Sequence, residues 1–138
     1  MMAALIGAAV GVLTILLARF IRGERWVYAV GLLTLPSLYA SFAVRVGDRT
    51  ASVTEMLVGI PYLVAGVLFA VVGVRQSAIV VGALWLLHGL FDLVHDRFIT
   101  NAGVPDGYPI FCFVVDAVIG VYVLWLARRL PEANLRRG

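Results

Sequence analysis

One apolar segment of the chain reads Trp85-Leu-Leu-His88-Gly-Leu-Phe-Asp92-Leu-Val-His95. Two imidazoles and one carboxylate stand at i, i+4 and i+7, a spacing that places them on one face of a helix. The surrounding residues 77–97 are long and apolar enough to cross a lipid bilayer. An ionisable side chain inside a membrane span is unfavourable and usually faces the bundle interior or a wet cavity. The motif therefore predicts a membrane helix that carries part of a functional site.

The composition of the whole chain is that of an integral membrane protein. Of its 138 residues, 62% are hydrophobic and 14% are charged, and the mean hydropathy is +1.01. Soluble domains carry roughly 25% charged and 45–50% apolar residues. The net charge is +3, but the arginines stand at the ends of apolar runs, which membrane topology explains better than nucleic-acid binding does. The single cysteine, Cys112, excludes an intramolecular disulfide.

Five apolar segments each approach the roughly 20 residues that cross the hydrocarbon core. They are residues 2–20, 26–44, 53–74, 77–97 and 109–127. We therefore predict one all-α domain over residues 1–138, a polytopic transmembrane helix bundle with five spans. Gly7 and Gly11 predict close helix packing on the first span. Pro36 and Pro61 fall within the second and third spans and predict kinks there.

The arginines predict the orientation, because five spans put the two termini on opposite sides. One side receives eight of them: Arg19, Arg22, Arg25, Arg75, Arg128, Arg129, Arg136 and Arg137. The other side receives Arg45, Arg49 and Arg97. The positive-inside rule then predicts the N-terminus out and the C-terminus in. We expect a bacterial inner (plasma) membrane protein whose 96–108 loop faces the extracytoplasmic side.

Helical geometry predicts which polar side chains lie at the same depth. With a rise of about 1.5 Å per residue, Asp92 on the fourth span and Asp116 on the fifth fall at similar depths. Glu55, in the first turn of the third span, falls near the depth of His95. The polar groups of three helices are therefore expected to gather in the outer leaflet.

These residue types favour a divalent metal site. The candidate ligands are His88, Asp92, His95 and Asp116, a set that suits Zn²⁺, or Fe²⁺ or Mn²⁺ if oxygen ligands dominate. Glu55 and Asp116 are the candidate catalytic residues, and Glu55 could act as a general base on a water held by the metal. The alternative is that these groups only bond neighbouring helices together. Haem held by both histidines is excluded within one chain, because they lie about 10 Å apart along one helix.

The pattern Trp85-x-x-His88-Gly89-x-x-Asp92-x-x-His95, followed by Cys112-x-x-x-Asp116, resembles an uncharacterised family of small bacterial integral membrane proteins. That resemblance implies a multi-span helical bundle and no established reaction. The chain is also loosely similar to the alkaline ceramidase and adiponectin-receptor superfamily, whose membrane zinc sites use His with Asp and Ser. It departs from that superfamily in having five predicted spans instead of seven and only two histidines.

Three functions are compatible with these features. The leading hypothesis is a metal-dependent membrane hydrolase that acts on a lipid or another apolar substrate. The second is a small proton- or cation-coupled transporter, in which the same polar groups form a relay or ion site. The third is a structural or accessory subunit of a membrane complex. The sequence predicts neither the oligomeric state nor the protein partners.

Overall fold

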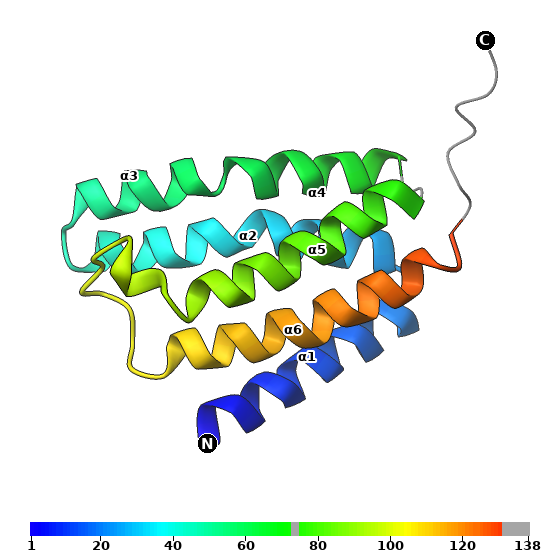
Figure 1. The fold of residues 1–138 in the computed structure, drawn as a ribbon, viewed down its shortest axis with the longest axis horizontal. Helices are drawn as coiled ribbons and strands as arrows, with labels where there is room; N and C mark the ends of the chain where they lie inside the picture. The colour runs from blue at the N-terminus through cyan, green and yellow to red at the C-terminus, as the bar shows by residue number, and fades with distance from the viewer. Residues whose placement is uncertain (73–74, 131–138) are drawn as a thin grey trace, which may run out of the picture.

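The computed structural model describes residues 1–72 and 75–130, and all regular secondary structure in these ranges is helical. The elements are α1 (Met2–Phe20), α2 (Glu24–Arg45), α3 (Arg49–Val58), α4 (Ile60–Val72), α5 (Arg75–Asp92), the short 3₁₀ helix η1 (His95–Arg97) and α6 (Tyr108–Ala127). The long helices run roughly along the longest axis of the molecule, and α3 and α4 follow one another along it (Figure 1). The predicted all-α fold is confirmed for the described residues.

The surface of the bundle is more apolar than that of a soluble protein. Leu5, Leu13 and Leu16 of α1 are all more than half exposed, whereas the described residues bury five acidic or histidine side chains. An apolar surface around an interior that includes polar groups is stable in a lipid bilayer, where apolar side chains contact lipid tails. By length and composition α1, α2 and α6 can each cross a membrane, and the pair α3–α4 raises the number to four if it forms one bent span.

The predicted five spans and their orientation are not confirmed. α5 does not pass as a span by composition, because its 18 residues include Arg75, Gln76, His88 and Asp92. It runs beside α6 for much of its length (Figure 1), so a membrane crossing by α5 stays a prediction. Two of the arginines used for the orientation, at 136 and 137, lie outside the described residues. So do residues 73–74, at the end of the third predicted span.

The kink predicted near Pro61 is confirmed as a 42° bend between α3 and α4. Proline has no N–H to donate to the preceding turn, which weakens the helix just before it. Gly59 stands at the bend and packs against α2, where an added Cβ would lie 2.2 Å from Cγ of Pro36. α2 itself continues as one helix through Pro36. The bend sets the direction in which Glu55 of α3 enters the bundle.

The fourth predicted span ends earlier as a helix than expected. α5 stops at Asp92, and the chain turns at Leu93 and Val94 before η1 begins at His95. A regular helix continued to residue 97 would place His95 on the same face as His88. The turn instead frees His95 to point toward a different helix. This local change alters the site that the sequence predicts.

Glycines allow close contact between helices, as predicted for the first span. An added Cβ at Gly7 would lie 2.6 Å from the carbonyl oxygen of Phe111 in α6, and one at Gly11 would lie 3.0 Å from Val118. The backbones of α1 and α6 therefore approach more closely than larger residues would permit. This packing supports the helix that carries Asp116.

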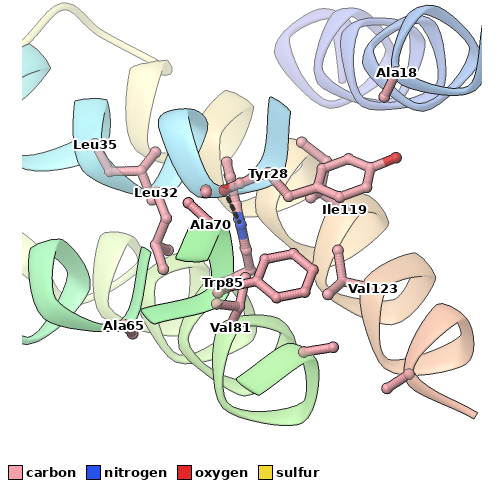
Figure 2. Close-up of a cluster of buried hydrophobic side chains, with 14 residues drawn as sticks. Ala18, Tyr28, Leu32, Leu35, Ala65, Ala70, Val81, Trp85, Ile119 and Val123 are labelled. Carbon is pink, nitrogen blue, oxygen red and sulfur yellow. Dashed lines mark hydrogen bonds between the residues drawn. The ribbon is translucent and has the colours of Figure 1, made fainter. Parts of the chain in front are cut away.

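A buried apolar cluster fills the bundle on one side of the polar residues. It includes Leu32 of α2, Val81 of α5, and Ile119 and Val123 of α6, which Figure 2 shows around the indole of Trp85. The Trp85 Nε1–H donates a hydrogen bond to the Tyr28 carbonyl oxygen at 3.3 Å (Figure 2). Trp85 lies one turn before His88, so the cluster borders the candidate site directly.

Candidate metal centre

Three acidic or histidine side chains converge between α5 and α6. His88 and Asp92 lie one turn apart on α5, and Asp116 faces them from α6. His88 Nδ1 is 2.7 Å from Asp116 Oδ2 and 3.4 Å from Asp92 Oδ2. One potential ligand atom of each residue lies within 4.8 Å of the other two, and all three residues are buried. This buried group could hold a metal ion.

Three of the four carboxylate oxygens of this group have no hydrogen bond. Both oxygens of Asp92 and Oδ1 of Asp116 are buried without a hydrogen bond in the described structure, and the two residues are 2% and 1% exposed. A buried carboxylate without compensation is strongly unfavourable, so buried charges are paired or coordinate metals. A cation between the two aspartates would satisfy both.

One of the observed separations falls within the range of metal ligands. A tetrahedral metal with bonds of about 2.0–2.2 Å holds neighbouring ligand atoms about 3.3–3.6 Å apart. The distance of 3.4 Å from His88 Nδ1 to Asp92 lies in this range, whereas the distance of 2.7 Å to Asp116 is that of a hydrogen bond. A metal bound through Nδ1 would replace that hydrogen bond.

His95 and Glu55 form a second buried pair instead of joining the three residues. His95 Nε2 lies 2.8 Å from Glu55 Oε1. Asn101 of the following loop donates its Nδ2–H to the same oxygen at 3.1 Å and to the Tyr39 carbonyl oxygen at 3.0 Å. The predicted match in depth between Glu55 and His95 is therefore confirmed. The structure does not place His95 among the three potential ligands, because the chain turns after Asp92.

Tyrosines separate and enclose the two polar groups. The Tyr39 ring lies 4.4 Å from the His95 ring and 6.3 Å from the His88 ring, measured between centroids. The Tyr62 ring meets His88 edge-on at 5.2 Å. Sequence reasoning did not assign Tyr39 or Asn101 to the site. Tyr39 lies near the end of α2 that approaches α3, so its depth along the helix could have indicated that it belongs to the site.

Two cavities adjoin these residues. A small one of about 10 Å³ is lined by residues of both polar groups, among them Glu55, His88, Asp92 and His95. Its volume matches one water molecule. A larger depression of about 310 Å³ lies under the loop after α5, where Asp92 and His95 line it together with Asp96, Ile99, Asn101 and Asp106. The buried site is thus next to a space that can admit a small molecule.

Cys112 lies one turn before Asp116 on α6 and is buried. It does not belong to the three-residue group found among the described residues.

Comparison with known proteins found no match among protein-family models, curated proteins or solved structures. The description of this protein therefore rests on its fold and its candidate site. It is an all-α protein with helices suited to a membrane and a buried His–Asp–Asp group. The functional assignment rests on the chemistry of that group.

Proposed function

We propose that His88, Asp92 and Asp116 bind a divalent metal ion, with Zn²⁺ the best match and Fe²⁺ or Mn²⁺ the alternatives. The observation that carries the proposal is the Asp92 carboxylate, which is 2% exposed, lacks a hydrogen bond and has His88 at 3.4 Å. With a neutral His88, the two aspartates would bring two negative charges into an apolar interior. One divalent cation balances both charges and also uses the imidazole as a ligand.

We further propose that this centre belongs to a membrane hydrolase. Catalytic zinc sites commonly have three protein ligands and keep a further position for water. The cavity of about 10 Å³ beside His88 and Asp92 has room for that water. A bound metal would lower the pKa of the water and polarise the scissile group. The chain's own contribution would be to exclude other solvent and to accept the proton.

Glu55 is the residue we assign to the proton transfer. It lines the same small cavity as His88 and Asp92, and its hydrogen bonds from His95 and Asn101 both end on Oε1. These bonds orient the carboxylate, and Oε2 is the oxygen that would face the water. Asp116, the other candidate catalytic residue, acts in this proposal as a metal ligand.

The substrate class we propose is a lipid or another apolar molecule with a polar group at its reactive end. The depression that reaches Asp92 has Ile99 and Val104 in its wall beside Asp96 and Asn101. Such mixed lining suits an amphipathic molecule. The protein would lie in a bacterial inner membrane with the depression on the extracytoplasmic side, as the distribution of arginines predicts.

The transporter hypothesis receives less support. A relay across the membrane needs polar groups beyond His88. From Trp85 back toward the start of α5 and from Ile119 toward the end of α6, the neighbouring interior is filled by the apolar cluster of Figure 2. An accessory role in a membrane complex stays an alternative. If the purified chain bound a metal and hydrolysed a substrate, an accessory role could not be its sole function.

Metal content tests the proposal. The wild-type chain, purified gently in detergent without chelators, should contain close to one equivalent of zinc, iron or manganese by elemental analysis. His88→Ala and Asp92→Asn should each lose it. His95→Ala is the matched control, since it removes the other imidazole while keeping the three ligands. A folded wild-type protein that stays free of metal after incubation with Zn²⁺ would overturn the proposal.

Hydrolysis is tested separately in vesicles of phosphatidylethanolamine, phosphatidylglycerol and ceramide. Mass spectrometry should detect fatty acid or headgroup release by the zinc-loaded wild type. Glu55→Gln should retain the metal and lose release by about 10²–10⁴-fold, as expected for a general base. Equal release by wild type and Glu55→Gln would refute the role of Glu55. A wild type that binds metal but releases no product would support the metal site and show that these lipids are not its substrates.

A further inference from the structure

A further cavity lies at the opposite end of the bundle from the candidate metal centre. It has a volume of about 220 Å³ and is lined by Arg22, Glu24, Arg25, Phe69, Leu126 and Leu130. These residues come from the turn between α1 and α2, the start of α2, the interior of α4 and the end of α6. The turn and the end of α6 meet on the side where α4 also ends (Figure 1). The cavity is independent of the proposed hydrolase site.

Positive charge concentrates at this end. Six arginines lie at or next to the ends of α1, α2, α5 and α6 here: Arg19, Arg22, Arg25, Arg75, Arg128 and Arg129. Glu24 is the single acidic residue among the described ones at this end. The Glu24 carboxylate accepts a hydrogen bond from the Tyr122 hydroxyl. Within the described ranges no ion pair involves Arg22 or Arg25. Both arginines are exposed residues and line the cavity.

The backbone holds Arg22 in an unusual conformation. Its φ of +55° is the single left-handed value of a non-glycine residue in the described chain, a conformation that is unfavourable for an L-residue. Such strain persists where the surrounding structure or a function requires it. Arg22 lines the cavity together with Arg25.

The apolar part of the cavity distinguishes a lipid from a free anion. Phe69, which is 1% exposed, lines the cavity with Leu126 of α6 and Leu130 just after that helix. Trp26 and Trp125 are exposed, and the guanidinium group of Arg25 lies 5.6 Å from the Trp26 ring. Exposed tryptophans beside arginines are typical of the headgroup level of a bilayer.

We propose that this cavity binds one anionic phospholipid, with its phosphate between Arg22 and Arg25 and the start of an acyl chain against Phe69, Leu126 and Leu130. Guanidinium groups bind phosphate oxygens through paired hydrogen bonds. Basic pockets between helices are known sites for anionic headgroups. The lipid would tie the turn between α1 and α2 to the end of α6.

Lipid retention tests this site. The purified full-length chain is equilibrated with mixed phosphatidylcholine and phosphatidylglycerol micelles at about 150 mM salt, where long-range charge effects are screened, and the retained lipid is quantified by mass spectrometry. The wild type should retain about one phosphatidylglycerol in preference to phosphatidylcholine. Arg22→Asn combined with Arg25→Gln should weaken this retention about tenfold or more. Asparagine is chosen because it tolerates the left-handed backbone.

The matched control is Arg128→Gln combined with Arg129→Gln, which removes two charges from the same end but outside the cavity. It should retain phosphatidylglycerol to within about twofold of wild type. Arg22→Lys with Arg25→Lys keeps the charge and should bind at an intermediate level, because lysine lacks the paired donors. The thermal midpoint and metal content of each variant show that it is folded.

Three results would overturn the proposal. Equal losses in the cavity variant and the control would show diffuse attraction instead of a site. Displacement of phosphatidylglycerol by millimolar inorganic phosphate would show a phosphate site without a lipid component. Absence of any preference in the wild type would show that the cavity is not selective.

Discussion

Gly89, within the His88–Asp92 motif, allows α5 and α6 to approach beside the candidate metal centre, and its replacement by alanine is our most informative prediction. An added Cβ at Gly89 would lie 2.9 Å from Cβ of Asp116 and 3.1 Å from the carbonyl oxygen of Phe113. Ordinary contacts of this kind begin near 3.4 Å. Both neighbours belong to the α6 backbone or its first side-chain carbon, so they cannot rotate away. The two helices would have to separate by about half an ångström.

The magnitude follows from this separation. Asp116 would be displaced together with its Cβ and the α6 backbone, away from His88 and Asp92 on α5. Overpacking of this kind destabilises a fold by about 1–3 kcal/mol. Misplaced ligands reduce metal affinity by about 10–100-fold when a supporting contact is lost. We therefore expect Gly89→Ala to bind Zn²⁺ at least about tenfold more weakly and to unfold at a lower temperature.

Competition with a zinc chelator and a thermal unfolding midpoint measure the two effects. Gly47→Ala is the control: its φ is +78° and no atom lies within 4 Å of an added Cβ. Alanine in that conformation costs about 1–2 kcal/mol, so the control should be destabilised without losing zinc affinity. If Gly89→Ala binds zinc as tightly as wild type and melts within a degree of it, the helices do not approach as closely as the structure indicates.

Three further predictions concern the two polar groups and the apolar cluster. His95→Ala leaves Glu55 buried with one partner fewer, so it should destabilise the fold by about 3 kcal/mol while the metal content stays near wild type; loss of metal would instead identify His95 as a ligand. Trp85→Phe removes the indole hydrogen bond to the Tyr28 carbonyl and should lower stability by about 1–2 kcal/mol, and an unchanged midpoint would refute that bond. Removal of metal with a chelator should lower the thermal midpoint of the wild type by several degrees, since a ligand bound only to the folded state stabilises it, whereas His88→Ala should show no such response.

Much of the architecture could be predicted because it depends on local sequence. The length of an apolar run and the 3.6-residue period predict a membrane helix before any contact is known. The same rise per residue predicted that Asp116 would reach the level of Asp92, and that Glu55 would reach the level of His95. Glu55 and His95 lie 2.8 Å apart, and Asp116 contacts His88, one turn from Asp92, at 2.7 Å. The depth of a residue along a helix can be predicted because it depends only on the residue's position in the sequence and the rise per residue.

Which residues contact one another in the site could not be predicted from depth along the helices. His95 shares a helical face with His88 by spacing, but α5 ends at Asp92 and the following turn directs His95 to Glu55. Helix ends depend on which tertiary partners satisfy the last turn. Tyr39 and Asn101 entered the site for the same reason, because their positions depend on how α2 and a loop pack around it.

The sequence by itself determined that this chain is helical, suited to a bilayer and equipped with buried acids and histidines at one level. Only the tertiary structure decided that His88, Asp92 and Asp116 form one group and that His95 and Glu55 form another. It also placed Arg22 and Arg25 around a cavity at the other end. The physical reason is that the depth of a side chain along a helix follows from counting residues, whereas its contact partners depend on how the helices are rotated and spaced. Close contacts at Gly59 and Gly89 set that spacing to fractions of an ångström.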